Sequence, residues 1–341
     1  MEKTINYLVK NKISFAAYSL PNSSDVYLIV DEQKNTKAGF VIQEFDTAIQ
    51  EFVIGKDVFL KNEEIQIQEV THLKQGISRQ NDSAEIKIFN QKEYQDYISL
   101  VIEKCNKGEF KKAVPARIIS HNKPTNFDIG TYFLKLIKAY KNTFVNLYYH
   151  PACGLWIGAT PELLVKEKIA NTYETYSLAG TKLTSEKRNW TAKETEEQQI
   201  VTDYIVNRLK CNNCKQIELG EVKTIQAGTI EHLKTEIKFS TTENIETIAK
   251  LLHPTPAVCG IPLKNSFDLI KEIEGNQRKN YTGFIGLNSS KNQELYVNLR
   301  CMQVLENNFL VYVGAGVTKD SIPEKEWFET KNKSMTLLKM V

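Results

Sequence analysis

Two helix-like segments of the sequence place glutamates three residues apart. The pairs are Glu194 and Glu197 in TAKETEEQQIV, and Glu326 and Glu329 in SIPEKEWFETKNKSM, where Lys333 follows. Residues at this spacing lie on one face of a helix. If the two faces met, the carboxylates would need a cation, and Mg²⁺ suits them because it binds one or two carboxylates together with water and an anionic substrate. Acidic pairs are also common on solvated helix faces, and the spacing alone leaves both interpretations open.

An arginine interrupts an apolar run near the C-terminus. The segment ELYVNLRCMQV (294–304) predicts one strand, with Leu295, Val297, Leu299 and Cys301 on one face and Arg300 on the other. A guanidinium binds carboxylates in a bidentate manner, so this residue is a candidate carboxylate clamp. An ordinary salt bridge at the rim of a sheet is the alternative.

A lysine and a glutamate in strand-like segments could exchange protons with a substrate. Lys112 leads into a strand in FKKAVPARII, where burial would favour the neutral amine that a general base needs. Glu162 follows a Thr-Pro turn in GATPELLV, where burial would raise its pKa and make it an acid. Neither residue is specific evidence by itself.

Glycines and histidines add further candidates. SLAGTK (177–182) and YVGAGV (312–317) place glycine inside strand-like runs, which is favourable where the backbone must approach another group closely. His232 and His253 are the histidines of interest. A lone histidine is more often structural than catalytic, and the residues alone leave both undecided.

Composition limits the classes of function. The 341 residues carry 44 lysines and arginines against 41 acidic residues, with no basic block, so binding to nucleic acid or to a membrane surface is not indicated. No apolar run reaches the length of a membrane span, and the first residues have no secretion-signal pattern. A cytoplasmic location is therefore expected. Cys211 and Cys214 form a CxxC without a second ligand pair, which favours an incidental pair over a zinc or redox site.

The remaining pattern predicts the elements that must position these residues. Residues 1–80 read as strands and 76–84 as a loop. Helices are expected at 90–108, 128–141, 193–210, 242–252 and 266–274 and in the last segment. Strands are expected at 111–120, 144–150 and 154–160, with hairpins over 163–182 and 294–317. This irregular mixture predicts an α+β fold with large antiparallel sheets, a sandwich-like core and helices packed outside.

Ten fragments in order resemble the chorismate-utilising enzymes, a family that includes isochorismate, salicylate, anthranilate and aminodeoxychorismate synthases. They are KKAVPAR, GATPELLV, SLAGT, KETEEQQIV, EHLKTEI, LHPTPAVCGIP, RKNYTGFIG, YVNLRCMQV, YVGAGV and PEKEWFETKNK. They span about 110–335. The resemblance implies one catalytic domain over 1–341, with variable N-terminal strands at 1–85 and the motif-bearing portion at 90–341. It also implies a monomer.

The resemblance assigns roles to individual residues. It implies that Glu197 and Glu329 hold Mg²⁺, with Glu194 and Glu326 as outer or water-mediated partners. It implies a chorismate-binding set of Gly180, Thr181, Ala257, Tyr281, Arg300, Gly314, Gly316 and Lys333. His232, rather than His253, matches the active-site histidine. Gln198, where a histidine is frequent, and Ile322, where an aspartate is frequent, depart from the family pattern.

Lys112 and Glu162 indicate the reaction that the resemblance implies. In members that add water to the ring, the lysine activates water at C2 and the glutamate protonates the departing C4 hydroxyl. Aminating members typically have Gln at the lysine position, and aminodeoxychorismate synthases place a lysine where Ala179 stands. Isochorismate synthase, an isomerase of menaquinone or siderophore biosynthesis, is therefore the expected function. Salicylate synthase, which further eliminates pyruvate, is the first alternative, and an aminating enzyme the second.

Overall fold

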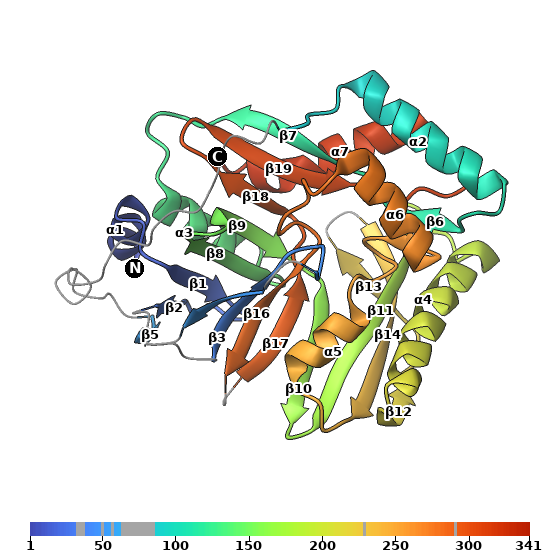
Figure 1. Ribbon diagram of the computed structural model, residues 1–341, viewed down its shortest axis with the longest axis horizontal. Coiled ribbons are helices and arrows are strands. Elements are labelled where there is room, and N and C mark those ends of the chain that lie inside the picture. Colours follow the sequence, from blue (N-terminus) through green and yellow to red (C-terminus); the bar gives the residue numbers. More distant parts are fainter. Residues whose placement is uncertain (32–37, 49–50, 56–57, 63–85, 228–229, 290–291) are drawn as a thin grey trace.

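The computed structural model describes residues 1–31, 38–48, 51–55, 58–62, 86–227, 230–289 and 292–341. Within these residues the chain folds into two large antiparallel sheets with helices on their outer sides (Figure 1). The predicted α+β class with a sandwich-like core is confirmed. The loop predicted at 76–84 lies outside the described residues.

The first sheet has eight strands. They are β1 (Phe15–Ser19), β2 (Tyr27–Val30), β5 (Val58–Lys61), β7 (Ala116–Asn122), β8 (Phe144–His150), β9 (Gly154–Thr160), β18 (Cys301–Val304) and β19 (Asn308–Gly314). Their order across the sheet is β5-β2-β1-β8-β9-β18-β19-β7. Strands from both ends of the chain therefore form one sheet.

The second sheet has nine strands. They are β3 (Gly39–Gln43), β4 (Phe52–Gly55), β10 (Leu163–Ile169), β11 (Thr172–Leu183), β12 (Lys215–Leu219), β13 (Lys223–Ala227), β14 (Ile230–Ser240), β16 (Phe284–Ser289) and β17 (Asn292–Val297). Their order is β12-β14-β11-β10-β17-β16-β3-β4, and β13 also pairs with β14. A separate two-stranded ladder joins β6 (Lys112–Ala113) to β15 (Gly260–Ile261).

The described residues contain seven α-helices. They are α1 (Glu2–Lys10), α2 (Gln91–Asn106), α3 (Ile129–Ala139), α4 (Ala192–Cys211), α5 (Ile245–Leu252), α6 (Leu263–Glu274) and α7 (Pro323–Leu338). α2 and α7 pack side by side, and α7 also lies along β19 (Figure 1). None of these helices is long and apolar enough to cross a membrane.

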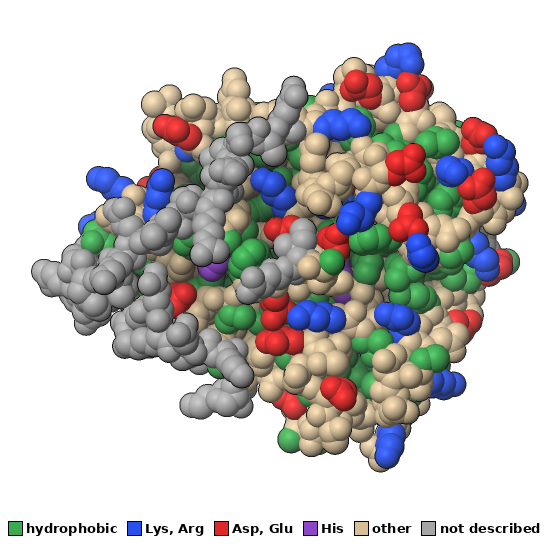
Figure 2. Space-filling view, viewed as in Figure 1, with side chains coloured by type: hydrophobic (Ala, Val, Ile, Leu, Met, Phe, Trp, Pro, Cys, Tyr) green, Lys and Arg blue, Asp and Glu red, His purple; other side chains and the backbone are tan. Residues whose placement is uncertain are grey.

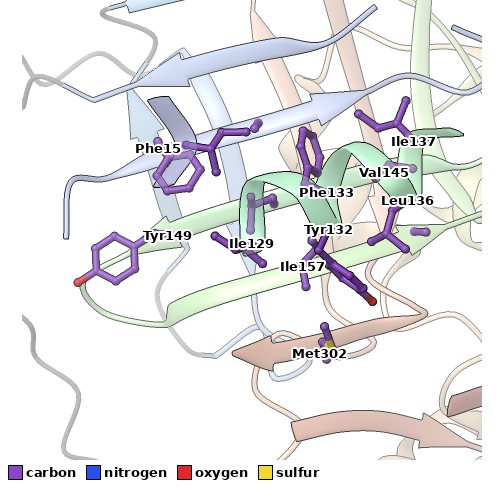
Figure 3. Close-up of a cluster of buried hydrophobic side chains, with 14 of the residues drawn as sticks. Phe15, Ile129, Tyr132, Phe133, Leu136, Ile137, Val145, Tyr149, Ile157 and Met302 are labelled. Carbon is purple, nitrogen blue, oxygen red and sulfur yellow. The ribbon is translucent and has the colours of Figure 1, made fainter. Parts of the chain in front are cut away.

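Three apolar clusters define four layers. The cluster between the sheets includes Ala16, Tyr18, Phe40, Tyr148, Trp156 and Tyr296. On the other side of the first sheet, α1, α3 and the end of α7 cover a cluster that includes Phe15, Ala17, Phe133 and Leu337 (Figure 3). On the other side of the second sheet, α4 and α5 cover a third cluster. Because alternate residues of β1 point into different clusters, all five of its residues are buried.

The predicted helices are confirmed, and their ends follow local capping chemistry. Asn90 and Glu93 form a capping box at the start of α2, and Asn244 caps α5. α6 begins earlier than predicted, directly after Pro262. Two predictions were incomplete, because residues 2–10 form a helix within a segment read as strands and β12–β14 were not anticipated.

The surface carries charges of both signs. On the face shown in Figure 2, lysine and arginine side chains are interspersed with aspartate and glutamate side chains among the described residues. This mixture matches the near balance of 44 basic and 41 acidic residues in the sequence.

Candidate active site

Lys112 lies in the short ladder that joins β6 to β15, and its side chain contacts α4. It pairs with Ile261 of β15, and its side chain is only 17% exposed. Its Nζ lies 3.2 Å from Oε1 of Glu197 on α4. The absence of a side chain at Gly316 leaves room for the lysine, since a Cβ there would lie 2.9 Å from Lys112 Cε. The segment YVGAGV therefore has a glycine where another group approaches the backbone closely, as the sequence predicted.

Glu162 stands where the chain passes from the first sheet to the second. It follows Thr160, the last residue of β9, and Pro161, and it precedes β10. Burial raises the pKa of this carboxyl to about 7, although the positive charges of Lys112 and Arg300 act in the opposite direction. A carboxyl with this pKa retains a proton near neutral pH, which a general acid requires.

The prediction that residues 294–304 form one strand was wrong. β17 ends at Val297 in the second sheet and β18 begins at Cys301 in the first sheet, so the chain changes sheets between them. Arg300 has a left-handed backbone conformation with φ of 48° at this crossover. The sequence pattern could not show the break, because Leu295 and Val297 pack beneath α4 and α5 and Cys301 packs between the sheets, and both environments select apolar residues.

The two crossovers are joined by backbone hydrogen bonds. Val297 N donates to the carbonyl of Glu162 at 2.9 Å, and Ala159 N donates to the carbonyl of Arg300 at 3.0 Å. The proton-holding carboxyl and the guanidinium are thus fixed near each other by main-chain contacts. Burial lowers the pKa of Arg300, whereas the charges of Glu329 and Glu162 act to raise it. Its side chain has no hydrogen bond or ion pair with any residue that the structure describes, so it is available to an anionic ligand.

Helix α7 contributes the second cation and two carboxylates. Lys333 Nζ lies 2.5 Å from Glu329 Oε1 and donates to the carbonyl of Gly314 at 2.9 Å. Burial lowers the pKa of Lys333, with Arg300 acting in the same direction. Burial, and to a smaller extent repulsion from Glu329, raises the pKa of Glu326. The helix thus presents its acidic face to the site.

Glu194 and Glu197 on α4 have different surroundings. Arg188 binds both oxygens of Glu194, at 2.6 and 3.0 Å, and the backbone N–H of Thr191 adds a bond of 2.7 Å. The hydrogen bonds from Arg188 are the main cause that lowers the pKa of Glu194 to about 2, against the effect of burial. Glu194 therefore caps its helix in this structure, whereas Glu197 faces Lys112.

The carboxylates partly fit a divalent cation. Among the described residues, no three His, Cys, Asp or Glu side chains lie close enough to form a metal site by themselves. However, Glu326 has a buried Oε2 without a hydrogen-bond partner in the described part of the chain, beside the charge of Glu329. Mg²⁺ binds few protein ligands and keeps several waters, so Glu197, Glu326 and Glu329 suit it better than Glu194 does.

His232 and the glycine bulge lie together on the second sheet. The register between β11 and β14 shifts at Gly180, which has φ of 70°, and Thr181 pairs with His232 in the ladder. Nδ1 of His232 donates to the carbonyl of Gly180 at 2.9 Å, since a carbonyl can only accept. Burial lowers the pKa of His232, and the charges of Lys333 and Arg300 act in the same direction. His253, by contrast, is buried in the core and contacts the Phe45 carbonyl.

Tyr281 and Ala257 lie on different sides of the candidate active site. Tyr281 is buried, stacks on Tyr312 with ring centroids 5.8 Å apart, and places its hydroxyl beside Gly314, where a Cβ would approach it to 3.0 Å. Ala257 lines a small cavity that Glu162 also lines. Both predicted wall residues are therefore close to residues of the acid–base and cation sets.

Some positioning residues gave little or no sequence signal. Gln198 was noted only as a departure from the family pattern, and its amide nitrogen bonds to Ser177 and Thr235, which fixes α4 to β11 and β14. Arg188 lies in a loop, and its bond to Glu194 follows from the folded path of that loop. Cys211 and Cys214 are free thiols at the end of α4.

These contacts bring lysine and arginine side chains, carboxylates and a carboxyl with a raised pKa into one region of the fold. Residues 48–341 match the family model of chorismate binding enzymes, and the chain belongs to this family. The family resemblance inferred from the ordered motifs is confirmed.

Curated relatives are similar in sequence, and solved structures share the fold. Isochorismate synthase EntC of Escherichia coli (strain K12) is 31% identical over 242 residues, which are 67% of this chain and 61% of EntC. The structure of DhbC from Bacillus anthracis superposes with a TM-score of 0.78 at 23% identity, covering 99% of this chain and 98% of that one. MenF, the menaquinone-specific isochorismate synthase of Escherichia coli, gives a TM-score of 0.78 at 18% identity, covering 98% and 90%. The matched segments span about half to three fifths of EntC and the next curated relatives.

Proposed function

We propose that this protein is an isochorismate synthase, an isomerase that converts chorismate to isochorismate. The observation that supports the proposal is that Lys112 lies near enough to Glu162 for its positive charge to act on the pKa of that carboxyl. Lys112 takes a proton from the water that attacks C2, and Glu162 gives its proton to the hydroxyl that leaves C4. One water enters and one leaves, so the reaction is balanced.

The charges around this pair fit the substrate. Chorismate is a dianion, and the free guanidinium of Arg300 and the ammonium of Lys333 provide two positive centres for its carboxylates. Glu197, Glu326 and Glu329 would hold Mg²⁺, which when bound would attract a substrate carboxylate and offset the negative charge of these glutamates. Isochorismate formed in this way would serve menaquinone or siderophore biosynthesis.

The test is product analysis with purified protein, chorismate and Mg²⁺. We expect isochorismate as the product, no dependence on ammonium, and loss of activity when a chelator removes the metal. Salicylate and pyruvate would instead identify a salicylate synthase, and ammonium-dependent formation of an amino product would identify an aminating enzyme.

Two variants test the acid–base pair. Lys112→Ala and Glu162→Gln should each lower turnover by roughly 10²–10⁴-fold, the range for general acid–base catalysis, while thermal melting stays close to that of the unmodified protein. Near-normal turnover in either variant would show that the role assigned to that residue is wrong.

A further inference from the structure

Strands β10 and β11 separate next to Glu162. The ladder between β10 and β11 pairs Lys166 with Glu174 and does not continue toward the start of β10. A small cavity with room for about one water molecule opens there, lined by Glu162 and by residues of both strands. On the β11 side the turn that carries Glu162 therefore lacks backbone pairing, whereas on its other side Leu163 pairs with Tyr296 and Val297 N donates to the carbonyl of Glu162.

Two side chains of β11 replace the missing ladder bonds. Thr175 Oγ1 donates to the carbonyl of Leu164 at 2.6 Å. The hydroxyl of Tyr176 accepts from Leu163 N at 2.7 Å and donates to the carbonyl of Pro161 at 2.8 Å. One hydroxyl thus binds the residue before Glu162 and the residue after it, and it uses both of its hydrogen-bonding capacities to do so.

We propose that Tyr176 is a positioning residue that holds Glu162 at the mouth of this cavity, in the orientation needed for proton transfer. The inference rests on the acid role proposed for Glu162. Without the hydroxyl, the peptide groups of Pro161 and Leu163 lose their shared partner, and the turn is held only by its backbone bonds to β17 and can shift on the β11 side. The carboxyl would then be misplaced relative to the substrate, although substrate-binding groups such as Arg300 would remain in place.

The experiment compares Tyr176→Phe with Tyr173→Phe, a matched loss of one hydroxyl from the same strand. Tyr173 donates to the carbonyl of Glu243, a contact outside the site. We expect Tyr176→Phe to lower kcat by about 10–100-fold, as misplacement of a reacting group does, and to change KM by less than about twofold. Tyr173→Phe should change neither. A rise in KM with normal kcat, or an equal loss in the control, would overturn the proposal.

The pH–rate profile provides a second test, because loss of a merely structural contact of Tyr176 would not shift the pKa of Glu162. The protonated fraction of Glu162 falls as pH rises through about 7, so the pH–rate profile of the unmodified protein should have an inflection there. In Tyr176→Phe the carboxyl gains access to water, its pKa moves down toward the ordinary value, and the inflection should occur at lower pH. The midpoint does not depend on how much variant is folded. An unchanged midpoint would refute the proposal.

A double variant separates this inference from the proposed function. Glu162→Gln with Tyr176→Phe should be no slower than Glu162→Gln alone, because Tyr176 acts through Glu162. An additional, multiplicative loss would contradict the proposal. Normal turnover in Glu162→Gln would instead reject the acid role itself, whereas an inactive Glu162→Gln with a normal Tyr176→Phe rejects only the positioning role.

Discussion

Replacing Glu274 by glutamine should strongly destabilise the protein, because it breaks a buried ion pair. Glu274 and Arg278 have side chains only 5% and 3% exposed, and Arg278 Nε lies 2.7 Å from Glu274 Oε2. The other carboxylate oxygen accepts from the hydroxyl of Tyr97 at 3.0 Å and from Ala116 N at 2.9 Å. Glutamine keeps the shape of the side chain but removes its charge.

The position of the pair connects it to the candidate site. Arg278 also donates to the carbonyls of Val114 and Val258, at 2.6 and 2.9 Å. Val114 follows the strand that carries Lys112, and Val258 follows Ala257. The variant leaves a guanidinium buried among these carbonyls without a counter-charge.

The expected loss follows from burial of the unpaired charge. Removing one partner of a buried pair costs about 3–5 kcal/mol of unfolding free energy. For a chain of 341 residues, an unfolding entropy of about 2.1 cal/mol/K per residue converts this loss into a fall of roughly 4–7 °C in Tm.

Thermal and denaturant unfolding provide the assay, with Glu103→Gln as the control. Glu103 also forms an i,i+4 pair, with Lys107, but their side chains are 58% and 60% exposed, so its loss should change stability by less than about 0.5 kcal/mol. Replacing both Glu274 and Arg278 by methionine removes the unpaired charge but deprives Ala116 N and the carbonyls of Val114 and Val258 of these partners, so it should restore only part of the lost stability. A loss below about 1 kcal/mol in Glu274→Gln would refute this account.

Three further predictions concern the site. The pH–rate profile should have an inflection at about 7, because the protonated fraction of Glu162 falls as pH rises through this value, and the residual activity of Glu162→Gln should lack this inflection. Arg300→Gln should raise KM for chorismate by roughly 10–100-fold, the value of a charge-assisted contact. It should not lower Tm, because burial already disfavours the charge of Arg300. An unchanged KM would show that Arg300 does not contact the substrate. Gly316→Ala should lower kcat by about tenfold or more by displacing Lys112, and normal kinetics would show that the lysine adapts to the added methyl group.

Local patterns in the sequence determined much of the molecule. The apolar stripe and Asn90 specified α2, and Pro254 and Gly275 follow the ends of α5 and α6. These signals succeed because helix caps and periodicity act within a few residues. The ordered motifs identified the family, and the spacing of the glutamates placed two acidic helix faces correctly on α4 and α7.

Only the tertiary structure decided how these residues meet. The chain changes sheets around Arg300 and again at Glu162, and backbone bonds between the two crossovers bring these side chains together. Arg188 forms an ion pair with Glu194, although the sequence pattern does not distinguish Glu194 from Glu197. The Tyr176 hydroxyl bonds to the backbone of both neighbours of Glu162, where β10 and β11 separate. Sequence periodicity records which face of an element is buried, whereas pairing between distant strands and loops decides which charged groups become partners.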